Sequence, residues 1–164
     1  MKFVISSSIL SQRLQTLGRV IPSKNSMPIL DNFLFQVVDG KLTLTASDNE
    51  ITLRTTLELV ESDGNLSFAV NAKTLQDAMK EIPEQPLEFT VNPDGLEIRV
   101  DFQNGHYTLV GQNADEYPVT KGLEGEVSTL VVDAQRLYSS VSRALFAAAD
   151  DPLRPVMNGV FFDY

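Results

Sequence analysis

The sequence contains no cysteine, a single histidine and no long apolar run. Without cysteine the chain cannot form disulfides, use thiolate chemistry or bind zinc through sulfur. No stretch approaches the roughly 20 apolar residues that a membrane span requires. The opening residues 1–6 carry one lysine and lack the apolar core of a signal peptide. We therefore expect a protein of the cytoplasm that makes no membrane contact.

Groups that could carry catalysis are equally scarce. His106 stands alone in a strand-like pattern, whereas a catalytic triad or a histidine metal site needs partners. The acid pairs Asp48 with Glu50 and Asp150 with Asp151 could hold Mg²⁺ or act as acid and base. In a chain with 22 acidic residues, solvation is the simpler interpretation of these pairs. With no phosphate-cradling glycine loop or nucleophile elbow, we expect no enzyme, no metal and no cofactor.

Three segments share one pattern, in which a short apolar run ends in Ser, Asn or Asp and large apolar residues follow at helical spacing. The polar residue is a good helix N-cap, because its side chain accepts a hydrogen bond from a free amide of the first turn. The pattern predicts a strand and then an amphipathic helix, with helices over roughly 6–20, 71–82 and 133–145. The apolar runs are residues 3–6, 68–71 and 130–133, followed by Leu10 and Leu14, Leu75 and Met79, and Leu137 and Val141.

A longer repeat contains the shorter one. Residues 28–35 resemble residues 155–162 at an offset of 155 − 28 = 127, and the first and third apolar runs give 130 − 3 = 127. Residues 120–126 are polar and contain glycine, as is usual for a linker. We therefore predict one complete domain over residues 1–124 and the truncated start of a second over residues 125–164.

Strand signals fill the space between the predicted helices. Apolar residues alternate with polar ones over residues 96–103, and turn-forming pairs such as Asp39-Gly40 and Asn104-Gly105 stand where hairpins need them. Each half of the domain thus consists of a strand, a helix and three antiparallel strands. The predicted fold class is α+β, with antiparallel sheets whose apolar face is covered by two helices.

The formal net charge of −9 argues against nucleic acid, but the charges are segregated. Six of the 13 basic residues and three of the 22 acidic residues fall in the predicted helices, which leaves 13 − 6 = 7 basic and 22 − 3 = 19 acidic residues elsewhere. A basic helix layer is suited to contact with phosphates that does not read bases. The alternative is a set of solvated helix faces on a protein-interaction scaffold that binds no DNA. The six basic residues are Arg13, Arg19, Lys73, Lys80, Arg136 and Arg143.

The segment over residues 150–159 has a composition of its own. Pro152 and Pro155 stiffen it, and Arg154 stands between them beside apolar residues. It is either a loop that enters a strand or part of a docking site, in which apolar walls and one polar anchor recognise a peptide.

Five motifs in order resemble the bacterial DNA polymerase III beta subunit, the family of replicative sliding clamps. This resemblance implies three similar domains per subunit and a homodimeric ring, with helices lining the hole and sheets outside. It implies a processivity factor that encircles double-stranded DNA without sequence preference. The implied partners are the DNA polymerase III catalytic subunit, the clamp loader and other proteins with a clamp-binding motif. The motifs are residues 1–3, 28–32, 45–50, 114–118 and 154–159.

The resemblance also assigns roles to particular residues. Lys24 and Lys73 match DNA-contacting residues, Arg154 and Met157 match the start of the pocket for partner peptides, and Tyr107 and Leu109 match the strand at the subunit interface. Some family members contact DNA through a glutamine and paired tyrosines, where this chain has Asp151, Pro155 and Val156. Two other functions stay open: the scaffold without DNA, and a carboxylate-based metal enzyme using acids near Asp48 or Asp150.

Overall fold

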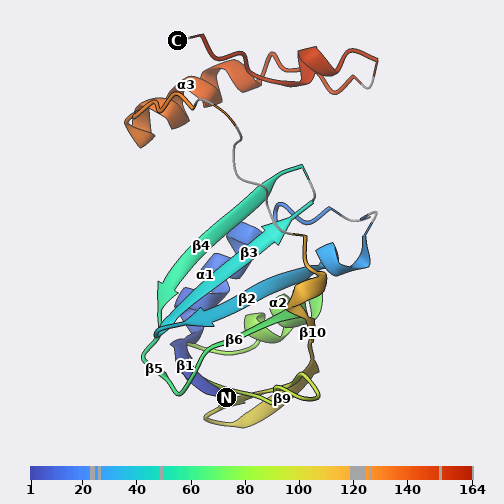
Figure 1. Ribbon diagram of the computed structural model, residues 1–164. Helices are drawn as coiled ribbons and strands as arrows, with labels where there is room; N and C mark the ends of the chain where they lie inside the picture. Colours follow the sequence, from blue (N-terminus) through green and yellow to red (C-terminus); the bar gives the residue numbers. More distant parts are fainter. Residues whose placement is uncertain are drawn as a thin grey trace. The chain divides into compact units, whose positions relative to one another are not determined.

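The computed structural model describes residues 1–22, 25, 27–48, 50–118, 125, 127–151 and 153–163 (Figure 1). The chain forms two compact units, Met1–Thr120 and Lys121–Tyr164. The predicted domain boundary after residue 124 falls beside residues outside the described part, so it stays a prediction. Among the helices that are described, none is long and apolar enough to cross a membrane.

The described part of the first unit contains two five-stranded antiparallel sheets and two α-helices, α1 (Ser7–Leu17) and α2 (Ala72–Lys80). Figure 1 shows both helices on the same side of the β2-β3-β4 strands, and the predicted α+β fold is confirmed. Short 3₁₀ turns, η1 (Pro28–Asp31) and η2 (Ala114–Glu116), flank the strands. One sheet has the order β5 (Glu61–Ser62), β1 (Lys2–Ser6), β7 (Pro86–Val91), β8 (Glu97–Phe102), β9 (Gly105–Val110). The other has the order β10 (Gln112–Asn113), β6 (Leu66–Asn71), β2 (Asn32–Val38), β3 (Lys41–Ser47), β4 (Thr52–Glu58).

The two halves of the unit exchange their first strands. Strand β1 pairs with β7, which belongs to the second half, with Phe3 opposite Phe89. Strand β6, the first of the second half, pairs with β2 of the first half, with Phe33 opposite Val70. The predicted order of strand, helix and three strands is therefore correct in each half. Each helix, however, connects one sheet to the other, which period-two patterning alone does not reveal.

Aromatic rings from both sheets join in the centre of the core. The ring centroids of Phe3 and Phe89 lie 4.8 Å apart, and those of Phe35 and Phe68 lie 5.1 Å apart. Phe35 and Phe89, at 6.4 Å, link strands of different sheets. These separations fall in the range at which aromatic pairs attract each other beyond their buried area. The predicted apolar residues of α1, Leu10 and Leu14, belong to this core together with Leu17, one turn further on; all three are at most 1% exposed, and together they form the α1 stripe.

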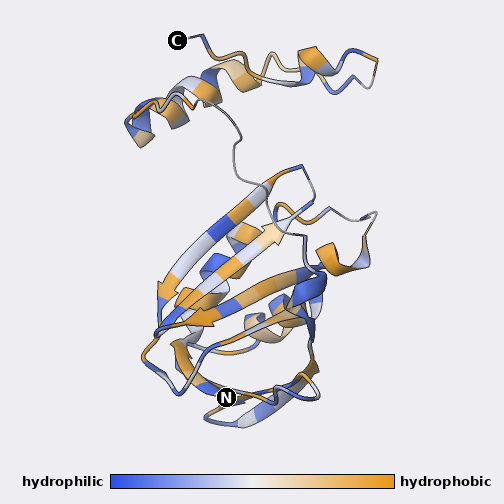
Figure 2. Ribbon diagram, in the orientation of Figure 1, coloured by the Kyte–Doolittle hydropathy of each residue, from blue (hydrophilic) through white to orange (hydrophobic). Residues whose placement is uncertain are grey.

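The hairpin turn predicted at Asp39-Gly40 is confirmed, whereas the loop predicted at Asn104-Gly105 is Gln103-Asn104, because Gly105 is the first residue of β9. Asp39 and Gly40 connect β2 to β3 with φ values of 49° and 75°, both in the left-handed region that a two-residue I′ turn requires. Figure 2 shows hydrophobic and hydrophilic residues alternating along β3 and β4, as expected for strands with one buried face.

The helix caps confirm two of three predictions. Asn71 accepts a hydrogen bond from the amide of Thr74 at 3.0 Å, and Asp133 accepts one from the amide of Arg136 at 2.9 Å. The predicted cap at Ser6 is wrong, because its hydroxyl pairs with the hydroxyl of Ser8. At this helix end the Ser7 amide donates to the carbonyl oxygen of Gln85 at 2.9 Å. The segment that contains Gln85 thus supplies the hydrogen-bond acceptor that a capping side chain would otherwise provide.

The second unit repeats the start of the first. Helix α3 (Ala134–Leu145) begins 134 − 7 = 127 residues after α1, and η3 (Pro155–Asn158) begins 155 − 28 = 127 residues after η1. The repeat is therefore confirmed at two elements. The strand predicted over residues 130–133 is wrong, since these residues are irregular and pair with no strand that is described. A strand needs a neighbour for its backbone hydrogen bonds, and the side chain of Val131 is 92% exposed.

The α1 stripe generates a stability prediction. Leu14→Ala should lower the free energy of unfolding by about 3 kcal/mol, because a buried leucine loses its transfer free energy and leaves a cavity. Ile9→Ala, on the same helix at 48% exposure, should lower it by less than about 1 kcal/mol. Urea unfolding followed by circular dichroism measures both values. Equal losses in the two variants would contradict the assignment of the buried face.

Candidate functional site

Three of the predicted DNA-contacting residues of the first unit lie on two helices that pack together. Arg13 on α1 and Lys73 and Lys80 on α2 are all exposed. Helix α1 ends at Leu17 and not at residue 20, so Arg19 lies in the following turn and is exposed there. Four predicted residues therefore belong to one helix layer.

A side-chain contact holds the two helices in this layer. The Gln76 Nε2 atom on α2 donates a hydrogen bond to the Leu14 carbonyl oxygen at 2.8 Å. Gly18 leaves the room that this approach needs, because a Cβ atom there would collide with the Gln76 side chain. The pairing fixes the end of α1 beside α2, which the sequence pattern did not indicate.

The four cations differ in how far they are neutralised. The Lys80 Nζ atom forms an ion pair with the Asp77 carboxylate at 2.8 Å, and the hydrogen bond from Lys80 holds the pKa of Asp77 below its usual value. Arg13, Arg19 and Lys73 form no ion pair with any residue that the structure describes. Three of the four are therefore available to an external anion, and Lys80 is available only in part.

Most basic residues on the strands, in contrast to those on the helices, form ion pairs with acids. Lys2 pairs with Glu88 at 2.7 Å, Lys41 with Glu58 at 3.2 Å, and Arg99 with Asp101 at 2.7 Å. Such exposed pairs contribute little stability, but they cancel the positive charge of the strands locally. The uncompensated positive charge of the first unit thus lies largely on its helix layer, with Arg54 on β4 as a strand residue that has no ion pair in the described chain.

A hollow of about 330 Å³ adjoins Lys73. It lies where the turn after α1 meets the start of α2, and its lining includes Gly18, Asn71 and Gln76. The carboxylate of Asp31 also lines it, so the hollow is not purely positive. Sequence patterning placed Lys73 at a helix start but gave no sign of this concavity.

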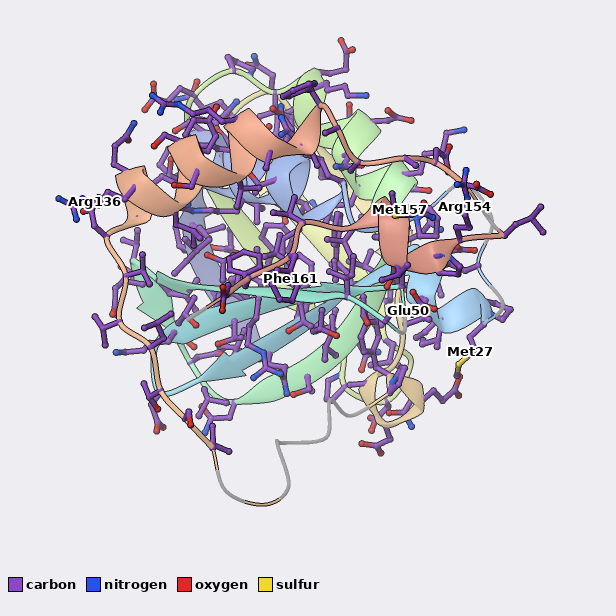
Figure 3. All side chains as sticks on the ribbon, turned by 90° about the horizontal axis from the view of Figure 1, so that it is seen from above. Met27, Glu50, Arg136, Arg154, Met157 and Phe161 are labelled. Atoms are coloured by element: carbon purple, nitrogen blue, oxygen red, sulfur yellow. The ribbon has the colours of Figure 1, made fainter. Side chains whose placement is uncertain are left out.

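The other predicted DNA-contacting residues do not belong to α1 or α2. Lys24 lies outside the described residues. Arg136 and Arg143 belong to α3 of the second unit, where both are exposed. Figure 3 shows Arg136 at the start of that helix.

The predicted interface residues lie on an edge strand. Among the strands described, β9 pairs with β8 and with no other. Tyr107 and Leu109 pack against the margin of the core, and the Tyr107 ring lies 5.4 Å from that of Phe102. Val110, on the opposite face of the strand, is 76% exposed. An edge strand of this kind carries unpaired backbone groups that another strand can use.

The predicted peptide-pocket residues share one short turn, η3, in the second unit. Arg154 precedes η3 and Met157 lies within it, as Figure 3 shows. The Arg154 Nε atom pairs with the Asp151 carboxylate at 2.8 Å, while the Met157 side chain is 50% exposed. The turn thus presents exposed apolar groups, Val156 and Met157, beside a partly neutralised arginine.

The carboxylates considered for catalysis have local structural partners. Asp48 accepts hydrogen bonds from the amides of Ile51 at 2.6 Å and Glu50 at 2.9 Å, and these lower its pKa. In the part of the chain that is described, no three histidine or acidic side chains are grouped so that they could hold a metal ion. His106 is exposed on β9, opposite Asp101 of β8.

Tyr117 is the one strongly perturbed titratable group of the described residues, and sequence reasoning gave it no role. It is 4% exposed and packs with Ile29, Leu30 and Ala69 in a second apolar cluster. Burial raises the pKa of Tyr117 to about 12.

This shift predicts a loss of stability in alkali. The unfolded chain releases the Tyr117 proton near pH 10, but the folded chain holds it to about pH 12. In that window the folded state binds more protons, so stability falls as pH rises. From about pH 9 to about pH 11, the parent should therefore lose more unfolding free energy than Tyr117→Phe does. Urea unfolding at both pH values tests this, and parallel losses would contradict it.

Comparison with known proteins matches the whole first unit to one family. Residues 1–121 match the family described as DNA polymerase III beta subunit, N-terminal domain. The beta sliding clamp of Haemophilus influenzae is 29% identical over 163 residues, which is 99% of this chain and 44% of the relative. That of Vibrio cholerae is 30% identical over 165 residues, again 99% and 44%. The DNA polymerase III subunit beta of Pseudomonas aeruginosa superposes with a TM-score of 0.87 at 25% identity, over 97% of this chain and 43% of that one. The chain thus spans less than half the length of these relatives.

Proposed function

The chain belongs to the DNA polymerase III beta subunit family, and from this we propose that it forms part of a sliding clamp. As a ring-shaped homodimer, the protein would encircle double-stranded DNA, slide along it and tether DNA polymerase III. We assign it no catalytic role of its own. A function on chromosomal DNA places it in the cytoplasm.

The observation that supports this proposal best is the distribution of unpaired positive charge. Arg13, Arg19 and Lys73 are exposed and unpaired within the described chain, whereas the strand cations Lys2, Lys41 and Arg99 are each paired with an acid. Phosphate contacts require such free cations and carry no sequence information. The helix layer is therefore the surface that we propose faces DNA.

The proposed DNA surface extends beyond these three residues. Lys24 joins it through the family resemblance, and Lys80 contributes less because Asp77 neutralises it in part. Arg136 and Arg143 add a second basic helix, α3. A few weak contacts suffice in a closed ring, because the topology retains DNA while the contacts exchange during sliding.

We assign partner binding to the turn at η3. Met157 supplies an exposed apolar group, and Arg154 supplies a polar anchor for a peptide, as small recognition sites require. The partners would be the polymerase catalytic subunit, the clamp loader and other proteins with a clamp-binding motif. Tyr107 and Leu109 on the edge strand β9 would form the homodimer contact.

The DNA surface predicts a change in salt dependence. In the full-length protein, Lys73→Ala should weaken binding to a short duplex and reduce the slope of log K against log salt by about 0.9, the value for one lost phosphate contact. Lys41→Ala, whose cation is already paired with Glu58, is the matched control and should change neither quantity. Fluorescence anisotropy over a range of salt concentrations measures both. An unchanged slope in Lys73→Ala, or the same loss in the control, would remove Lys73 from the surface.

The edge strand predicts an effect on assembly. In the full-length protein, Leu109→Asp should weaken the homodimer at least about tenfold, since a buried unpaired charge at an interface costs more than 1.4 kcal/mol. Val60→Asp, at a position that is 71% exposed outside β9, serves as control. Sedimentation velocity over a dilution series reports the monomer fraction. A dimer as strong as the parent in Leu109→Asp would show that β9 lies away from the interface.

A further inference from the structure

A pocket of about 310 Å³ lies on the face of the β10-β6-β2-β3-β4 sheet that points away from α1 and α2. The 3₁₀ turn η2 and the residues after it run across this face, and Figure 1 shows η2 in front of β2. The volume is at the lower end of the range for small-molecule sites. The pocket lies within the first unit and includes none of the residues proposed above to contact DNA, partners or a second subunit. Leu34, Thr45, Arg54, Ser67, Tyr117 and Pro118 are among its lining residues.

Strand register builds the floor of this pocket. Leu34 of β2 lies opposite Thr45 of β3, and Thr45 lies opposite Arg54 of β4. Directly opposed residues place their side chains on the same face of a sheet. The floor of the pocket is therefore a row of three side chains: the apolar Leu34, the hydroxyl-bearing Thr45 and the basic Arg54.

The hydroxyl in this row is buried and unsatisfied. Thr45 is 2% exposed, and its Oγ1 atom has no hydrogen-bond partner within the described residues. Other hydroxyls of the same two strands are paired, Thr43 with Thr56 at 3.1 Å and Ser47 with Thr52 at 2.9 Å. Because an unpaired buried polar group costs free energy, a ligand that accepts from Thr45 gains a favourable interaction.

Arg54, which lies opposite Thr45 in the strand register, supplies an unpaired cation to the lining of this pocket. Its guanidinium forms no ion pair with the residues described, although the pocket also contains the carboxylate of Asp115. A planar guanidinium binds a carboxylate through two parallel hydrogen bonds. Asp115 repels further negative charge, so the pocket favours a ligand with a single negative charge over a polyanion.

We propose that this pocket binds a monocarboxylate that carries a short apolar group. The carboxylate accepts hydrogen bonds from Arg54 and from the Thr45 hydroxyl, and the apolar group packs between Leu34 and Pro118. The same chemistry is offered by a free small acid and by the C-terminus of a peptide that ends in an apolar residue. This site is independent of the clamp function proposed above.

An NMR titration of the ¹⁵N-labelled 164-residue chain tests the site with N-acetyl-leucine as the probe. Saturable shifts are expected at the amides of Thr45, Arg54 and Ser67. Arg54→Gln should weaken binding at least tenfold and Thr45→Val several-fold, whereas Arg99→Gln, an exposed arginine on the other sheet, should bind as the parent does. N-acetyl-leucinamide has the same shape without the charge and should bind at least tenfold more weakly. Inorganic phosphate should not displace the probe.

The proposal is overturned if no saturable shift occurs up to the solubility limit of the probe. It is equally overturned if Arg54→Gln binds as the parent does, if the amide binds as well as the acid, or if phosphate displaces the acid. Two further probes distinguish the sources of the ligand. Tighter binding of N-acetylglycyl-leucine than of 4-methylpentanoate supports the site as one for a peptide C-terminus, and the reverse order supports it as one for a free acid.

Discussion

The pairing of β1 with β7 is the interaction on which the rest of the first unit depends. It places Phe3 against Phe89, and through Phe35 and Phe68 it joins both sheets into one aromatic core. Since β1 lies in one sheet and β2 in the other, α1 must cross between them, and α2 crosses back between β6 and β7. Two crossing helices of this kind lie side by side in one layer. This layer then carries exposed basic side chains that lie some 60 residues apart in the sequence, as Arg13 and Lys73 do.

Much of this architecture can be predicted from the sequence, because its signals are local. Helical spacing identified the Leu10, Leu14 and Leu17 stripe, Asp39-Gly40 identified a hairpin, and the 127-residue offset identified where α3 and η3 begin. The exchange of first strands could not be predicted in this way, because a period of two reports that a strand has a buried face but not which strand lies beside it. The wrong prediction of a strand over residues 130–133 has the same cause. Its pattern is that of a strand, but strand structure also requires a neighbour.

The candidate sites, too, can be predicted from the sequence only where their signal is local. Residue type and helix face were enough to select Arg13, Lys73 and Lys80, but only coordinates show that Lys80 is paired with Asp77 while the other two are unpaired among the described residues. Thr45 and Arg54 gave no sequence signal, since they are nine residues apart in an ordinary polar strand pattern. Their proximity arises from β3-β4 register, and the burial of Thr45 from the chain around Tyr117 that crosses the sheet. Family resemblance, in contrast, is enough to propose Tyr107 and Leu109 for the subunit interface.

The acidic total of the chain and its proposed function on DNA are compatible on electrostatic grounds. Exposed charges interact over a Debye length of about 8 Å at physiological ionic strength, so a phosphate at the helix layer responds to nearby cations and not to the net charge of −9. The ion pairs of Lys2, Lys41 and Arg99 neutralise three of the strand cations that would otherwise attract DNA to the outside of the sheets, and Arg54 on β4 stays without an ion pair among the described residues. Glu61 on β5 and Glu97 on β8 are exposed and form no ion pair among the described residues, so they repel DNA there. The acidic exterior thus increases the preference of DNA for the helix layer over the outside of the sheets. For a ring that slides, this preference matters more than a high affinity for DNA.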